Sequence, residues 1–126
     1  MTSNQIKTLS DDDLNKTIAK ALGWTEIHDE WAMTIGINPE GERDSIRDYS
    51  ESFLYSEELL RVLQFRGWLC DIRLHPQSPP CCRFYRESGT HPTRYRQAQT
   101  LPRVIAEAAL ITLLIEKGEG VYETAT

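Results

Sequence analysis

The feature that most constrains the fold is TLPRVIAEAALITLLIEKG, residues 100–118, which predicts a helix that is apolar around most of its circumference. Thr100 and Pro102 are typical of a helix start, and Gly118 is typical of a helix end. The apolar side chains form two stripes, one with Leu101, Ile105, Ala108, Thr112 and Ile115 and the other with Ala106, Leu110, Leu113 and Leu114. Such a helix must be covered on two sides, either as the central helix of a layered domain or because one stripe meets another subunit. The helical period does not choose between these explanations, and the second one predicts a homo-oligomer.

Two further helices precede it. Ser10 followed by three aspartates is typical of a helix start, because these side chains suit the positive end of the helix dipole, and Gly23 is suited to end that helix. A second helix is expected to open within DYSES, residues 48–52, and to end at Gly67. Residues 24–47 show no sustained period, so we expect a long loop there with at most one short strand near AMTIGI.

Three short segments between the second and last helices have the residue pattern of strands. They are WLCDIRLH, CCRFYRE and TRYRQA, separated by turn sequences at QSPP and SGTHP. In the first of them, Arg73 alternates with Cys70 and Ile72 and therefore belongs to the more polar face. The whole pattern predicts an α+β fold, an α/β/α layered sandwich with one small, mainly antiparallel sheet and three main helices. Residues 1–126 are expected to form a single domain.

Several classes of protein are disfavoured by composition. The N-terminus lacks the basic and apolar regions of a secretory signal, and the longest apolar run contains Glu107 and is shorter than the roughly 18 residues that a membrane span requires. We therefore expect no membrane partner. Three cysteines, of which two are adjacent, do not suggest a disulfide framework and favour a reducing, cytoplasmic location.

Charge is distributed unevenly along this chain, whose formal net charge is −5. Residues 1–58 carry 13 acids and 5 bases, whereas residues 59–103 carry 2 acids and 8 bases, and every one of these eight bases is arginine. The planar guanidinium offers paired donors that match phosphate oxygens and stacks on aromatic rings, so this choice favours recognition of an anion. A long nucleic acid would require many phosphate contacts and is disfavoured by the acidic flanks, while one small anion needs only a few arginines.

The candidate ligand-binding residues follow from this arginine-rich segment and from its aromatic neighbours. They are Arg73, Arg83, Arg86, Arg94, Arg96, Tyr85, Tyr95, Trp24, Tyr49 and Ser50. Each also has a structural explanation. The arginines suit the solvated edge of a hairpin, Trp24 suits a position over the core, and Tyr49 and Ser50 suit the start of a helix, which is itself a place where anions bind.

Neither a metal site nor an active site is indicated by a motif. His75, Cys81, Cys82 and His91 supply suitable ligand types, but their spacing fits no common zinc pattern. The sequence contains no phosphate-binding glycine loop and no nucleophile or metalloprotease motif. We therefore expect no metal, no cofactor and no enzymatic activity, although a hydrolase built on one of the adjacent cysteines and a histidine stays open.

The chain resembles the phage ABA sandwich domain family of small bacteriophage proteins. The resemblance is carried by Gly23 and Trp24 at the end of the first helix, by the DYS sequence at residues 48–50, and by TLPRVIAEAAL in the last helix. It implies an α/β/α domain of phage or prophage origin in the cytoplasm of the infected bacterial host. Joined to the arginines, it predicts a counter-defence protein that sequesters a small nucleotide immune signal, a cyclic oligonucleotide or an ADP-ribose derivative, without cleaving it. The alternative is a non-catalytic protein–protein interaction module of phage origin.

Overall fold

The computed structural model describes residues 1–88 and 94–119, and within them it contains four helices and two three-stranded antiparallel sheets. The elements in chain order are α1 (Ser3–Thr8), α2 (Asp11–Ala21), β1 (Thr25–Glu30), β2 (Met33–Ile37), β3 (Arg43–Ser45), α3 (Phe53–Phe65), β4 (Leu69–His75), β5 (Ser78–Tyr85), β6 (Arg96–Gln97) and α4 (Leu101–Glu116). The expected α+β class is confirmed.

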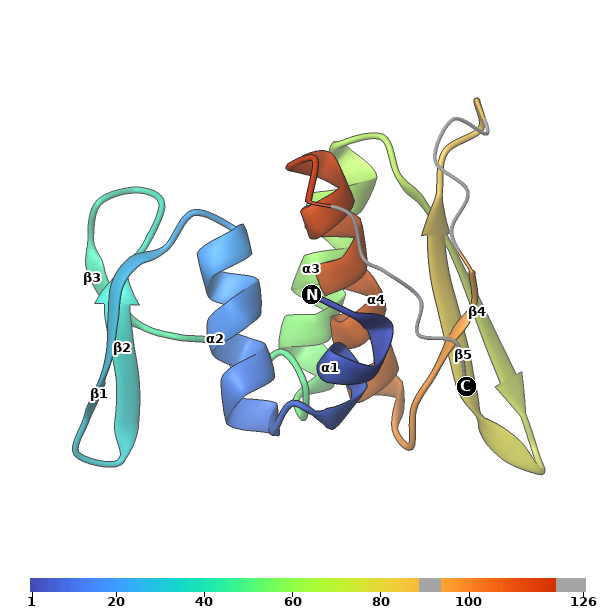
Figure 1. The fold of residues 1–126 in the computed structure, drawn as a ribbon, viewed down its shortest axis with the longest axis horizontal. Coiled ribbons are helices and arrows are strands. Elements are labelled where there is room, and N and C mark those ends of the chain that lie inside the picture. The colour runs from blue at the N-terminus through green and yellow to red at the C-terminus, as the bar shows by residue number, and fades with distance from the viewer. Residues whose placement is uncertain (89–93, 120–126) are drawn as a thin grey trace.

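The order of the layers differs from the expected one. The helices lie in the middle of the molecule, with the β1–β2–β3 sheet at one end of its longest axis and the β4–β5–β6 sheet at the other (Figure 1). The additional sheet comes from residues 24–47, where we expected a long loop with at most one short strand near AMTIGI. The strand near AMTIGI is present as β2, while β1 and β3 were not expected. Most residues of β1 are exposed, so its two faces are both polar and the alternation that reveals a half-buried strand is missing.

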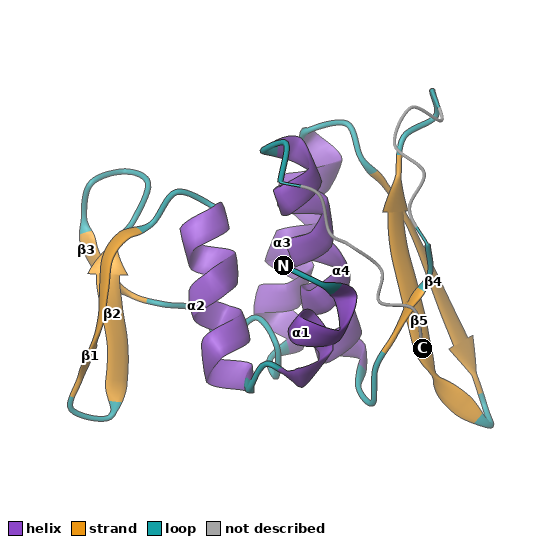
Figure 2. Ribbon diagram, viewed as in Figure 1, coloured by secondary structure: helices purple, strands orange, loops and turns teal. Residues whose placement is uncertain are grey.

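The sheet at the other end is close to expectation (Figure 2). β4 pairs with β5 along almost its whole length, and β6 adds a short third strand through Cys81 and Cys82. The pairing is irregular between Arg73 and His75, and Leu74 between them is exposed although it alternates with Cys70 and Ile72. The second expected turn, residues 88–92, lies outside the described residues from position 89 onward.

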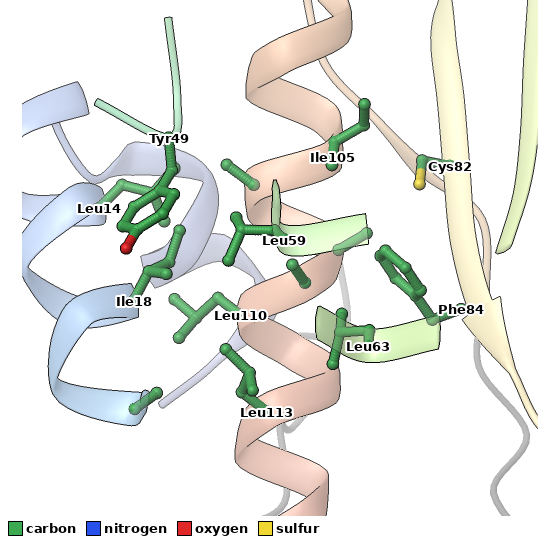
Figure 3. Packing of buried hydrophobic residues seen from close by; sticks show 14 of the residues in the cluster. Leu14, Ile18, Tyr49, Leu59, Leu63, Cys82, Phe84, Ile105, Leu110 and Leu113 are labelled. Carbon is green, nitrogen blue, oxygen red and sulfur yellow. The ribbon is translucent and has the colours of Figure 1, made fainter. Parts of the chain in front are cut away.

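Helix α4 is the central element of the core. Its neighbours are α2 and α3 on one side and β5 on the other, and Leu110 and Ile105 pack within this layer (Figure 3). Both apolar stripes are therefore covered within one chain, which is the layered-domain explanation. The stripes lend no support to an oligomer, and the homo-oligomer stays a prediction.

The starts of α2 and α4 could be predicted from their local sequence. Ser10 Oγ accepts a hydrogen bond from Asp13 N at 3.1 Å, and Thr100 Oγ1 accepts one from Arg103 N at 3.3 Å, as expected of capping residues. The short helix α1 was missed because it spans six residues and buries only Ile6, too little to produce a periodic pattern.

The cap position of α3 is Ser52, the last residue of DYSES, so the helix opens within the expected segment. Asp48 Oδ1 does accept a hydrogen bond from Glu51 N at 3.2 Å, but this bond closes a turn before the helix. The helix itself begins after Ser52, whose side chain makes no capping hydrogen bond.

One buried ionic cluster connects the two ends of the chain. The Glu107 side chain on α4 is 2% exposed, and its two oxygens each accept a hydrogen bond at 2.7 Å, one from Arg96 Nε and one from Arg103 Nε. Arg103 also donates to Asp11 at 3.0 Å and to the Leu9 carbonyl at 2.7 Å. Arg96 donates to the Ser3 carbonyl at 2.8 Å, so α1, α2, β6 and α4 converge on one carboxylate.

We expect Glu107→Ala to lower the free energy of unfolding by about 3–5 kcal/mol, because it leaves two arginines at least partly buried without their counter-charge. Urea unfolding measures this loss. Glu57→Ala, which breaks only the exposed ion pair with Arg61, is the matched control and should cost about 0.5 kcal/mol or less. Should Glu107→Ala prove too unstable to purify, Glu107→Gln keeps the shape and should still unfold at clearly lower urea than the wild type. Equal midpoints would contradict the role of Glu107.

Candidate functional site

The outer face of the β4–β5–β6 sheet carries several of the predicted ligand-binding residues. Cys82 and Phe84 on β5 point toward α4 (Figure 3), so the residues that alternate with them face outward. Arg83 and Tyr85 are two of these outward residues, and Arg83 pairs with Asp71 on β4. The strand period of two thus places one surface of arginine, tyrosine and aspartate on the end of the molecule.

Two arginines and two tyrosines form a continuous stack on this face. The guanidinium carbon of Arg73 lies 4.6 Å from the centre of the Tyr95 ring, and that of Arg83 lies 4.9 Å from the same ring. Arg83 is also 4.8 Å from the centre of the Tyr85 ring. Alternating cations and rings at these distances attract each other and hold planar guanidinium groups in fixed orientations. We call Arg73, Tyr95, Arg83 and Tyr85 the arginine–tyrosine stack.

Asp71 supplies a carboxylate to the middle of this stack. Its Oδ2 accepts a hydrogen bond from the Tyr95 hydroxyl, and that bond raises the pKa of Tyr95 above its ordinary value. The same oxygen lies 3.9 Å from Arg83 Nε and 4.0 Å from Arg73 Nη2. These separations are ion-pair distances and are too long for hydrogen bonds, so both guanidinium groups keep donors for a further acceptor.

The Nε atom of Arg83 is the most informative atom of the site. It is buried, yet it makes no hydrogen bond to any described residue. Leaving a buried donor of a charged group unpaired costs about 1–3 kcal/mol or more, so such atoms usually have a partner. A small anion would supply the missing acceptor once the side chains that cover this atom move aside.

Arg86 makes its contacts outside the stack. Arg86 lies over the Trp68 ring at 4.2 Å from its centre, donates to the Arg66 carbonyl at 3.3 Å, and lies 3.7 Å from Glu116. Arg86 therefore helps to fix the end of α3 and α4. Arg94 is exposed and precedes β6.

Arg96 is a correction to the predicted set. Its side chain is 9% exposed and is occupied by the buried pair with Glu107 and by its bonds to Ser3. Because β6 alternates, Arg96 faces the core while the preceding Tyr95 faces outward. It is a structural residue.

Trp24, Tyr49 and Ser50 also do not belong with the stack, because they are buried on the other side of the helical layer. Tyr49 packs beside Leu14 and Ile18 (Figure 3), and its burial raises its pKa to about 12. Ser50 N donates to the side-chain oxygen of Asn15 at 3.0 Å. Neither residue caps a helix, because the cap position of α3 is Ser52.

Sequence reasoning missed the roles of Asp71 and Arg103. The alternation of β4 placed Asp71 on the outward face with Arg73, but it gave no sign of the contacts that Asp71 makes with Tyr95 and the two arginines. Arg103 had been counted with the basic segment, and its position four residues before Glu107 on a helix is a signal for an ion pair.

The cysteines and histidines do not form a metal site in the described part of the chain. No group of three or more His, Cys, Asp or Glu side chains there could hold an ion. Cys70 Sγ and Cys82 Sγ are 3.8 Å apart, and their hydrogen bond raises the pKa of the buried Cys82 thiol. His75 is exposed, and His91 lies outside the described residues.

A hollow of about 340 Å³ lies beside the other sheet, next to β2 and α2. Four carboxylates line it together with two bases, Lys16 and Arg47, so its character is acidic and it is unsuited to an anion; the four are Asp11, Asp12, Asp48 and Glu51. A hydrogen bond with Asp11 raises the pKa of Glu51. We call this cavity the acidic hollow.

Comparisons of the chain with protein-family models, with curated proteins and with solved structures found no match. The resemblance to the phage ABA sandwich domain family therefore stays a prediction. No helix in the described part of the chain combines the length and apolar character needed to span a membrane.

We expect the Tyr95 hydroxyl to ionise at higher pH than an ordinary tyrosine, because a hydrogen bond to a carboxylate favours the neutral phenol. Ultraviolet titration of tyrosinate in the wild type, compared with Tyr95→Phe, assigns the transition. Asp71→Asn should move it downward, toward the ordinary pKa. An unchanged Tyr95 transition in Asp71→Asn would show that the hydrogen bond is not formed in solution.

Proposed function

We propose that the arginine–tyrosine stack binds a small phosphorylated nucleotide and that the protein holds this ligand without cleaving it. The observation that carries the proposal is the buried Arg83 Nε, which makes no hydrogen bond to any described residue although it lies between two aromatic rings. A phosphate oxygen is the acceptor that a guanidinium fork binds best.

The aromatic part of a nucleotide fits the same surface. The stack ends at Tyr85 on one side and at Arg73 on the other, and the Arg73 side chain is 69% exposed. A base can extend the stack at either end, and base stacking on a side-chain ring contributes about 1–3 kcal/mol. Ring and phosphate recognition together favour a nucleotide over inorganic phosphate.

The charge of the site favours a small ligand. Asp71 offsets part of the positive charge of Arg73 and Arg83, so the face is only weakly basic. Binding of a long polyanion depends on many phosphate contacts, and the acidic N-terminal part of the chain would repel one. A single phosphate or cyclic diester needs no such extended basic surface.

Reversible binding is supported by the residue types on this face. Arginine stays protonated near neutral pH and cannot act as a general base. The one carboxylate of the stack region, Asp71, is held by Tyr95 and by two cations. In a phage or prophage setting, binding of this kind in the host cytoplasm would deplete a nucleotide immune signal and so serve as counter-defence.

Thermal shift with a panel of cyclic mono-, di- and trinucleotides and ADP-ribose derivatives tests the proposal. A ligand at one hundred times its Kd adds about 2.7 kcal/mol to the stability. For a chain of this size that raises Tm by roughly 10 °C. Recovery of the intact ligand after heat denaturation of the protein supports sequestration. A cleaved product exceeding one equivalent per chain would instead establish catalysis.

Arg83→Met should weaken binding of the ligand found in this panel about tenfold or more, because it removes a charge-assisted hydrogen bond of about 1.5–3 kcal/mol. Arg61→Met, at an exposed arginine on α3, is the matched control and should bind like the wild type. Isothermal titration measures both. Equal affinity of the two variants would exclude Arg83 as the phosphate contact.

Asp71→Asn should bind the same ligand more tightly than the wild type does. The phosphate would lie near the Asp71 carboxylate, and two like charges about 4 Å apart in water repel by about 1 kcal/mol, equivalent to about fivefold in Kd. The comparison is made at low salt, where the repulsion is least screened. Weaker binding by Asp71→Asn would mean that Asp71 orients the arginines and does not compete with the ligand.

A further inference from the structure

The β1–β2 hairpin exposes one tryptophan completely. The Trp31 side chain is 99% exposed at the two-residue turn between the strands, and the neighbouring Met33 is 54% exposed. Single exposed apolar side chains are common on protein surfaces, and Phe65 is 93% exposed in this protein as well. Tryptophan, however, is among the residues most enriched at the energetic centres of interfaces.

The backbone at this turn supports the same conclusion. Trp31 has a φ of 59°, a left-handed conformation that glycine adopts readily and a bulky residue adopts only under strain. Glycine is also the residue preferred at the first position of such hairpin turns. The strain is evidence that the position serves something other than the stability of the hairpin.

The acidic hollow lies directly beside this hairpin. Ala32 and Met33, the two residues that follow Trp31, contribute to its wall, and four carboxylates line it. Residues 24–47 as a whole carry six acids and two arginines. The surface around Trp31 therefore suits a partner that presents guanidinium groups beside an apolar or aromatic surface.

The opposite end of the same molecule has that chemistry. Arg73 in the arginine–tyrosine stack is largely exposed, and Leu69 and Leu74 on the same strand are 38% and 71% exposed. Tryptophan is the ring that binds a guanidinium most strongly, and a carboxylate-lined hollow would accept the charge of Arg73. The two surfaces are complementary in charge and in aromatic character.

We propose that this protein associates head to tail with further copies of itself, with Trp31 and the acidic hollow of one copy bound to the arginine–tyrosine stack of the next. The sheets that carry Trp31 and the arginine–tyrosine stack lie at opposite ends of the longest axis (Figure 1), so we expect one copy to engage different neighbours through its two surfaces. Contacts between two different surfaces continue from copy to copy and produce open chains or rings, whereas a two-fold dimer uses the same surface twice.

The inference does not depend on a nucleotide ligand, because it rests on the hairpin, the hollow and the stack alone. It shares only the stack with the proposed nucleotide site. Trp31→Gly therefore separates the two, since it should abolish self-association and leave a free stack that binds the nucleotide at least as tightly as the wild type does. Glycine also relieves the left-handed strain at position 31, so this variant should melt no lower than the wild type.

Two variants test the head-to-tail arrangement. The hairpin variant carries Trp31→Gly and Asp12→Lys, and the stack variant carries Arg73→Glu and Arg83→Glu. Sedimentation velocity at low salt should show mass that rises with concentration for the wild type, and a species of 14.5 kDa for each variant alone. Mixing the two variants leaves one intact surface of each kind, so the mixture should form a dimer that grows no further. Leu54→Ser with Glu57→Lys, at exposed positions on α3, is the control and should associate like the wild type.

Three outcomes would contradict the head-to-tail arrangement. A wild type that stays at 14.5 kDa up to high concentration would overturn the proposal and leave Trp31 to a different protein as its partner. Self-association that survives in the hairpin variant would exclude the hairpin from the interface. Variants that fail to dimerise when mixed, although each is folded by circular dichroism, would exclude the pairing of these two surfaces.

Discussion

The buried carboxylate of Glu107 is the interaction on which the rest of the structure depends. It lies on the central helix α4 and binds Arg96 from β6 and Arg103 from its own helix, and these arginines in turn hold the carbonyl groups of Ser3 and Leu9. A buried charge is tolerated only when its partners satisfy it fully. The N-terminal residues, the last strand and the central helix must therefore be assembled together, and this fixes the strand that presents Tyr95 to the solvent.

The arginine-rich segment thus divides into two groups with different roles. Arg96 and Arg103 point inward and neutralise Glu107, while Arg73 and Arg83 point outward and stack with tyrosines. Sequence established that the segment is basic and that β4 and β5 alternate. It could not assign the two groups, because both faces of this sheet carry arginine and the partner of Arg96 is a glutamate on a separate helix. The strand period of two assigns each side chain to one face of the sheet. Only the three-dimensional contacts show which arginines are already paired with a carboxylate inside the protein.

Only β2 of the N-terminal sheet was expected from the sequence, and β1 was missed for a different reason. A strand is recognised when one face is buried and the other is wet, and β1 has most of its residues exposed on both faces. Its pairing with β2 is also interrupted between Thr25 and His28, and Glu26 there has a positive φ of 53°. A hairpin of this kind depends on few core contacts. Its residues are consequently free to serve recognition, which agrees with the exposure of Trp31 at its tip.

A nucleotide and a neighbouring copy of the protein would both bind the guanidinium groups of the stack. Arg73 and Arg83 offer a limited number of hydrogen-bond donors, and Asp71 already engages them electrostatically. A phosphate and the acidic hollow of a neighbouring copy would therefore exclude each other at the stack. Each ligand shifts an equilibrium only by its difference in affinity for the two states. A nucleotide that binds the free stack must then favour single copies, and self-association must lower the apparent affinity for the nucleotide by the same factor, because linked binding equilibria are reciprocal.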